Sequence, residues 1–149
     1  MLVLIMCLEK IKKITAEEDI IAYKLLETSA FYSEYVSPFY LFKWEIGRVY
    51  SEGHIAPLLG YDDEEGRPTI HGGCFHTFKN LGEAQLQLQV HRDRWTLNTY
   101  IAKCRIPKDS NFIYEGEYKG ATPAFGDKGK YICKGYASEK LEILEILPD

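Results

Sequence analysis

The chain has 149 residues and a formal net charge of -4, with 46% hydrophobic and 27% charged residues. This length fits one domain with its own core, and the composition excludes a disordered chain. The negative net charge provides no broad positive field for a phosphate backbone, so we expect no nucleic-acid partner.

The four cysteines are far apart in the chain and include no C-x-x-C pair: Cys7, Cys74, Cys104 and Cys133. This spacing indicates neither a disulfide framework nor a zinc finger. Reduced thiols are the simplest interpretation, and we therefore predict a cytoplasmic protein.

The first eight residues are apolar, but no basic region precedes them and Glu9 follows at once. The segment is too short for a secretory signal or a membrane span, so we expect no membrane partner. We interpret residues 1–8 as an edge strand or an N-terminal extension, with the natural start at Met1 or Met6.

Short strands and polar connections follow. Residues 15–18 have a capping-box pattern, which predicts a single helical turn, and the β-branched residues in 20–26 favour a strand. Residues 28–38 have the composition of a loop, and apolar alternation predicts a strand over 39–46. Turn-forming residues dominate 51–68, which predicts a long surface excursion, and long loops are often functional. His54 and Tyr61 are its candidate binding residues.

Signals are densest in the middle of the chain. Two glycines precede the aromatic run 74–78, which we predict to be a strand, and a helix is expected from Asn80 toward His91. Asn80 and Glu83 have the spacing of an N-cap and its reciprocal partner. His76 and Thr77 would then lie just before a helix N-terminus, where backbone N–H groups attract anions. His76, Thr77 and Asn80 are therefore candidate binding residues.

The remaining segments predict a sheet. Extended patterns cover 95–106 and 111–118, a glycine- and proline-bearing loop covers 120–129, and two strand-like pieces cover 131–137 and 141–147. The last also matches a helix, but closing a sheet suits it better. We predict one α+β domain over residues 1–149, mostly antiparallel sheet, with one main helix after a central strand.

Several short motifs occur together from about residue 20 onward: Ala22-Tyr23-Lys24, Trp44-Glu45-Ile46-Gly47, Gly73-Cys74-Phe75-His76-Thr77-Phe78 with Glu83-Ala84, Ala102-Lys103-Cys104-Arg105-Ile106-Pro107, and Ala137-Ser138-Glu139-Lys140-Leu141. In this order they resemble small uncharacterised domains of phage and bacterial genomes. Those domains carry a glycine-Phe-His-aromatic segment and are sometimes joined to pentapeptide repeats. Here Cys74 stands between the glycine and the Phe-His pair. The resemblance implies a shared phage or prophage type of fold and brings no activity with it.

We favour a binding or interaction module, without cofactor, over an enzyme. Its partner would be an unknown protein or small molecule, and the chain would be a monomer or a homodimer. The loop residues 51–68 and exposed aromatics such as Phe31, Tyr32 and Tyr35 would supply the contacts, since aromatic side chains are common at interfaces.

Two other functions fit parts of the sequence. In one, the chain resembles ADP-ribosyltransferases that use NAD, with Tyr23, His76, Thr77 and Glu115 or Glu117 as catalytic candidates. A carboxylate would stabilise the developing ribosyl cation in such a site.

In the other, a small zinc-binding domain uses His71, Cys74 and His76, with His54 as a further ligand. Histidine and cysteine are good zinc ligands, and alternate residues of a strand share a face. The H-x-x-C-x-H spacing matches no known finger.

Overall fold

The computed structural model describes residues 8–28, 35–36, 43–61, 65–94, 98–120 and 131–148. Most of the expected segments 1–8, 28–38 and 120–129 therefore lie outside the described residues. Leu8 is described, and its N–H and C=O both bond to Ile70, at 3.1 and 2.9 Å.

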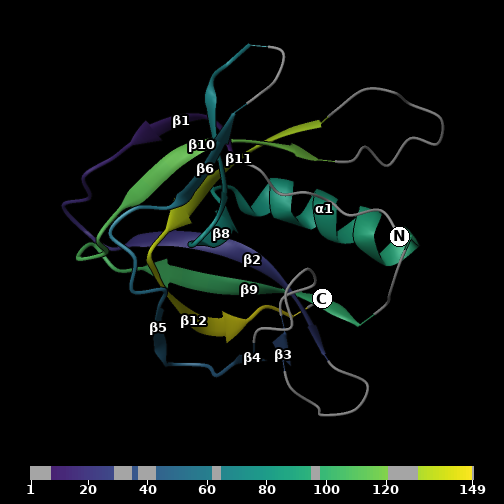
Figure 1. Cartoon of the computed structure of the whole chain (residues 1–149). Helices are drawn as coiled ribbons and strands as arrows, with labels where there is room; N and C mark the ends of the chain where they lie inside the picture. Colours follow the sequence, from purple (N-terminus) through teal and green to yellow (C-terminus); the bar gives the residue numbers. More distant parts are fainter. Residues whose placement is uncertain are drawn as a thin grey trace.

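The described chain is mostly antiparallel β-sheet, curled into a half-barrel (Figure 1). The main sheet has the order β1-β10-β11-β8-β2-β9-β12-β5, with β3 and β4 attached beside β2, and β6 and β7 form a separate two-stranded ribbon. The strands are β1 (Glu9–Lys13), β2 (Ile20–Thr28), β3 (Tyr35–Val36), β4 (Lys43–Trp44), β5 (Val49–Ser51), β6 (Leu58–Tyr61), β7 (Pro68–Gly72), β8 (Phe75–Phe78), β9 (Thr99–Ile106), β10 (Ile113–Gly120), β11 (Tyr131–Ser138) and β12 (Lys140–Ile146). The predicted α+β, mostly antiparallel arrangement is confirmed, although the fold is nearly all-β.

The helix α1 (Leu81–Arg94) lies along one face of this sheet (Figure 1). It begins where the sequence predicts, because the N–H of Ala84 donates to the carbonyl of Asn80 at 3.1 Å. Glu83 has a role the capping pattern does not predict: its Oε2 accepts the backbone N–H of Lys134 at 2.7 Å. Glu83 thus attaches the first turn of the helix to β11.

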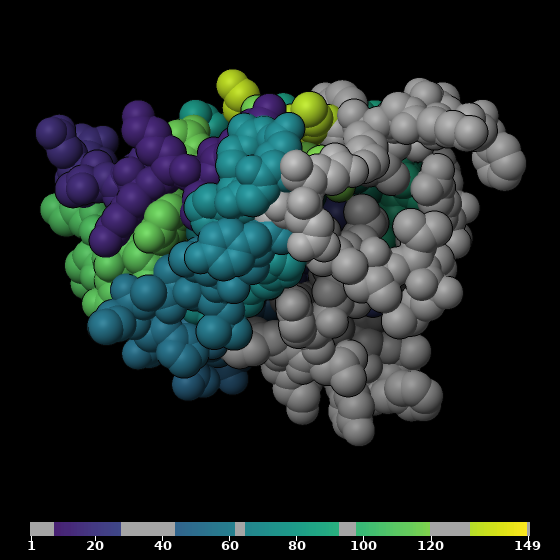
Figure 2. Space-filling model, turned by 45° about the horizontal axis from the view of Figure 1, so that its top comes forward, coloured from purple at the N-terminus to yellow at the C-terminus, as the bar shows by residue number. Residues whose placement is uncertain are grey.

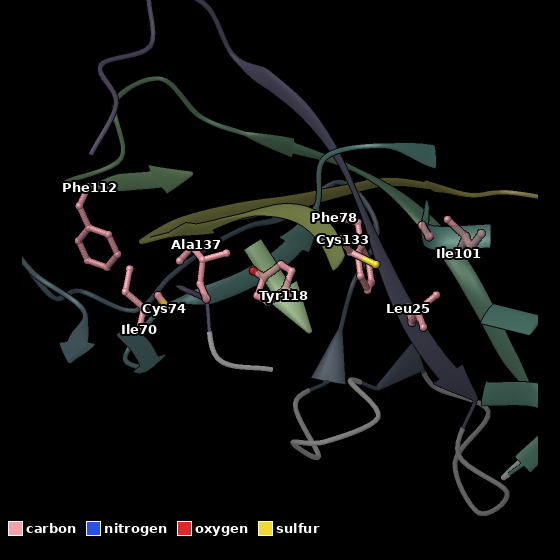
Figure 3. Close-up of a cluster of buried hydrophobic side chains, with 11 residues drawn as sticks. Leu25, Ile70, Cys74, Phe78, Ile101, Phe112, Tyr118, Cys133 and Ala137 are labelled. Atoms are coloured by element: carbon pink, nitrogen blue, oxygen red, sulfur yellow. The ribbon is translucent and has the colours of Figure 1, made fainter. Parts of the chain in front are cut away.

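Strand alternation divides the apolar side chains between two cores. The first lies on the α1 side and includes Tyr118, which Figure 3 shows between Ala137 on one side and Phe78 and Cys133 on the other. The second lies on the opposite face and is built around Trp44, Phe75, Tyr136, Leu141 and Ile143, with further residues from β2 and β9. Both faces of the sheet are therefore covered, as one domain of this length requires.

Several predicted elements differ from the structure. Residues 15–18 form a bend instead of a helical turn, and of the strand expected over 39–46 the described part holds only β4. The helix runs to Arg94, beyond the His91 expected from the sequence, and β9 spans Thr99–Ile106; residues 95–97 of the expected strand lie outside the described residues. The surface excursion 51–68 contains β6, a strand that turn-rich composition hides. Both strands expected at the end of the chain are present, as β11 and β12.

Candidate functional site

The site predicted at the strand-helix junction is not open. His76 is 7% exposed, Thr77 is fully buried, and Asn80 lies on the surface. The imidazole points into the α1-side core from β8, because its side chain alternates with Phe75 and Thr77 on the other face. The structure thus places His76 and Thr77 in the interior on opposite faces of β8 and Asn80 at the surface, so the three side chains do not share one face.

His76 instead belongs to a closed hydrogen-bond chain. The hydroxyl of Tyr118 donates to the carbonyl of Tyr136 at 2.6 Å, so its contact of 3.2 Å with His76 Nδ1 requires the ring to donate there. The other nitrogen, Nε2, lies 3.6 Å from Cys74 Sγ. Burial, helped by the positive charge of Lys24, lowers the pKa of His76 to about 4. The ring is therefore neutral at physiological pH, and its contacts hold the side chains of Tyr118 and Cys74 in place.

The residues expected for an ADP-ribosyltransferase are separated. Glu115 pairs across the sheet with Tyr136, which pairs with Thr77, so these three share one face. Tyr23 pairs with Phe78 and points to the opposite face, as His76 does.

Each glutamate also has a lysine partner at the surface. Lys79 pairs with Glu115, and Lys10 Nζ lies 3.4 Å from Glu117. The structure thus places Thr77, Glu115 and Glu117 on one face of the sheet and Tyr23 and His76 on the other.

Of the expected zinc ligands, the structure brings Cys74 and His76 into contact, while the side chain of His71 bonds to Thr69. His71 Nε2 lies 2.8 Å from Thr69 Oγ1, while Cys74 and His76 contact each other in the core. His54 is exposed, and its carbonyl accepts a bond from Asn111 Nδ2 at 3.2 Å. Within the described ranges, no group of three or more His, Cys, Asp or Glu side chains could hold a metal ion.

Among the described residues, four of the eight large apolar side chains that are exposed lie on β6 or just before it. We call Ile55, Leu58, Leu59 and Tyr61 the β6 surface; they are 85%, 64%, 52% and 69% exposed. The β6–β7 ribbon projects beyond the main sheet in Figure 1, and this part of the chain, in blue to teal, faces the viewer in Figure 2. A soluble domain rarely exposes neighbouring large apolar residues without a use for them.

One edge of β6 is open within the described part of the chain. β7 pairs with β6 along one edge and, through Ile70, with Leu8 along the other. Among the described residues, β6 therefore has a neighbouring strand on one side only. The imidazole of His71 on β7 packs against Gly60 on β6. A Cβ at position 60 would lie 2.1 Å from His71 Nε2, so only glycine leaves room for this ring. An open strand edge presents backbone N–H and C=O groups to any extended segment that comes alongside.

A buried glutamate, not singled out by the sequence, fixes the chain that leads to this ribbon. Glu139 is fully buried, and its Oε1 accepts the backbone N–H of Asn111 at 3.0 Å. Its Oε2 accepts the hydroxyl of Ser51 and the N–H of Gly53, the latter at 3.4 Å. Its backbone carbonyl also accepts the N–H of Glu52 at 3.0 Å. The end of β5 is thereby clamped against the β11–β12 corner, a short distance along the chain from Ile55.

Comparisons with protein-family models, with curated proteins and with solved structures give no match. The resemblance to small phage and bacterial domains therefore stays a prediction. In the described residues, no helix is both long and apolar enough to cross a bilayer.

Proposed function

We propose that this protein is an interaction module that binds an extended polypeptide segment along β6. The observation that carries the proposal is the β6 surface itself: four large apolar side chains, each more than half exposed, on and beside an open strand edge. Strand addition to such an edge is a common mode of peptide recognition, in which backbone hydrogen bonds give affinity and side-chain contacts give specificity.

The magnitudes favour a transient complex. Burying what is exposed of four such side chains contributes on the order of 4–6 kcal/mol, at about 1–1.5 kcal/mol each. Loss of translational and rotational freedom costs roughly as much or more, about 4–15 kcal/mol. Backbone hydrogen bonds along β6 must then supply the surplus, and we expect a Kd of about 1 μM to 1 mM.

Charge selects the partner. The chain leaves β6 with the sequence Asp62-Asp63-Glu64-Glu65, and the whole protein carries a net charge of -4. A segment that alternates apolar residues with lysine or arginine would complement both the apolar side chains and this acidic run. A second copy of this chain would bring like charge to the interface, so we favour a basic, apolar partner segment over self-association.

The test is a selection of random peptides displayed on a surface, performed against the immobilised protein. We expect the enriched peptides to alternate apolar and basic residues, and their binding to weaken as salt increases. Leu59→Asp and Tyr61→Asp should abolish binding. The matched control is Ile132→Asp, because Ile132 on β11 is 50% exposed, close to the 52% of Leu59, and lies outside the β6–β7 ribbon.

Peptides that bind the Leu59→Asp variant as well as the wild type would refute the proposal, as would the absence of any enrichment. Light scattering provides the second measurement. A stable dimer of the wild type that Leu59→Asp dissociates would show that a second copy, and not a peptide, occupies β6.

A further inference from the structure

The backbone of β7 uses one of its two edges for Leu8. The N–H and the C=O of Ile70 both bond to Leu8, at 2.9 and 3.1 Å. Successive residues of an antiparallel strand direct these groups to opposite edges, so those of Thr69 are directed toward β6. Thr69 lies opposite Gly60 and forms the hydrogen-bonded pair of the ribbon with it. Pro68 is directed away from β6, like Ile70, and has no N–H to offer in any case.

The register of the ribbon then determines which backbone groups of β6 face outward. Leu59 lies opposite Ile70 and Tyr61 lies opposite Pro68, so both belong to non-hydrogen-bonded pairs. In such a pair, the N–H and the C=O point away from the partner strand. Leu59 and Tyr61 therefore each direct an N–H and a C=O to the open edge of β6. Within the described ranges, no second strand pairs with this edge.

The same two residues also supply exposed apolar side chains. Leu59 and Tyr61 share one face of the ribbon, because they alternate with Gly60, and each is more than half exposed. On the other face, Gly60 lies against the imidazole of His71. A segment that comes alongside β6 therefore meets outward backbone groups and apolar side chains at the same two positions, 59 and 61.

From this arrangement we infer that the partner segment runs antiparallel to β6 and bonds to it through two apolar residues, the first opposite Tyr61 and the second, two residues later, opposite Leu59. The inference rests on the proposed function and specifies how the partner binds at the same edge. Directly opposed residues of a hydrogen-bonded antiparallel pair exchange both bonds, and their side chains lie on the same face. The two apolar residues of the partner thus make the backbone hydrogen bonds, while the residue between them turns its N–H away from β6.

The number of partner residues that must be ordered favours the antiparallel direction. Three consecutive residues of an antiparallel partner complete all four bonds to Leu59 and Tyr61. In a parallel pair, each residue bonds to the two residues that flank the one opposite it, so the same four bonds require five partner residues. Because every additional ordered residue loses conformational entropy, the antiparallel complex is the more stable one.

The antiparallel direction also agrees with the charges. It places the N-terminal side of the partner at the end of β6, from which the sequence continues with Asp62-Asp63-Glu64-Glu65. We therefore expect the basic residues that contribute most to binding to precede the two apolar residues in the partner sequence.

The experiment takes a peptide that the display selection enriches and N-methylates it at one residue at a time, which replaces one N–H by a methyl group. At either apolar residue we expect the Kd to rise about tenfold or more, because a hydrogen bond is lost and a C=O of β6 is left without its donor. The matched control is N-methylation of the residue between them, where the Kd should stay within about threefold, because that N–H points away from β6.

A larger loss at the residue between the two apolar ones would overturn the inference, because in a parallel partner the apolar residues are not the ones that bond to β6. Equal effects at all three positions would overturn it as well. Both outcomes leave peptide binding at the β6 surface intact, whereas a selection that enriches no peptide would refute the proposed function and this inference together.

Amide hydrogen exchange in the free protein, followed by NMR, tests the open edge without a partner. After correction for intrinsic exchange rates, the amide of Gly60 should exchange at least about tenfold more slowly than the amides of Leu59 and Tyr61, because only the Gly60 amide bonds to β7. Exchange of all three amides at the same rate would refute the assignment of outward groups to positions 59 and 61.

Discussion

The clamp at Glu139 gives the sharpest test of the fold. In Glu139→Gln the side chain keeps its shape but offers one acceptor oxygen in place of two. If that oxygen stays with Ser51 and Gly53, the new NH₂ group faces the N–H of Asn111, 3.0 Å from the atom it replaces. One hydrogen bond to a carboxylate is then lost, and the part-buried N–H of Asn111 faces another donor.

The expected loss follows from these contacts. A hydrogen bond to a charged group contributes about 1.5–3 kcal/mol, and an unsatisfied buried donor costs about 1–3 kcal/mol. Removing the buried charge returns part of this, because a carboxylate is costly to desolvate. We expect Glu139→Gln to lower the free energy of unfolding by about 2–4 kcal/mol, which lowers the Tm by roughly 5–15 °C in a chain of this size.

Urea unfolding monitored by tryptophan fluorescence measures this change. The matched control is Glu145→Gln on β12, the strand that follows Glu139, where the side chain is exposed and the expected change is within about 0.5 kcal/mol. Equal stabilities for the two variants would show that the Glu139 carboxylate does not hold the end of β5. They would also refute the idea that Glu139 positions the β6 surface.

Three further outcomes are expected. Gly135→Ala should prevent folding or cost at least about 3 kcal/mol by thermal unfolding, since its Cβ would lie 1.9 Å from Tyr118 Cε2 and 2.4 Å from the Thr77 carbonyl. Gly82→Ala, with nothing within 4 Å of the added Cβ, should instead raise stability by about 0.5–1 kcal/mol. Burial lowers the pKa of His76 to about 4, so the unfolded chain binds a proton at this ring more readily than the folded chain does. The free energy of unfolding should therefore be highest above about pH 6.5. It should fall by about 3 kcal/mol as the pH drops toward 4. Urea titrations at each pH should show this loss in the wild type and a smaller one in His76→Gln, and equal losses in both would contradict it.

Sequence patterns predicted the elements whose signal is local. β-branched residues marked β2, Asn80 marked the helix start, and the alternation in the tail marked β12. The four-residue strand β6 was not predicted, because its sequence Leu-Leu-Gly-Tyr lies among turn-forming residues and becomes a strand only by pairing with β7. A short strand of this kind depends on its partner more than on its own composition.

The candidate site could be predicted only in part. Residues 51–68 were expected to be at the surface, and the exposed Tyr61 agrees with that expectation. The burial of His76 could not be predicted, because alternation shows that successive side chains point to opposite faces but not that both faces are covered. Glu139 was missed because its partners Ser51, Gly53 and Asn111 are distant in sequence, and no local pattern connects them.

β2 and β8 share a single backbone pair, and this pair divides the main sheet into two parts. We call them leaves: one contains β1, β10, β11 and β8, and the other contains β2, β9, β12 and β5. Neither leaf is a continuous stretch of chain: the polypeptide passes from one to the other between β1 and β2, again before and after β8, and twice more before it reaches β12. Separating the two leaves between β2 and β8 would therefore require both leaves to unfold together. The chain connections between the leaves thus stabilise the boundary at which only one backbone pair is formed. Because these contacts join residues distant in sequence, we expect folding to be slow.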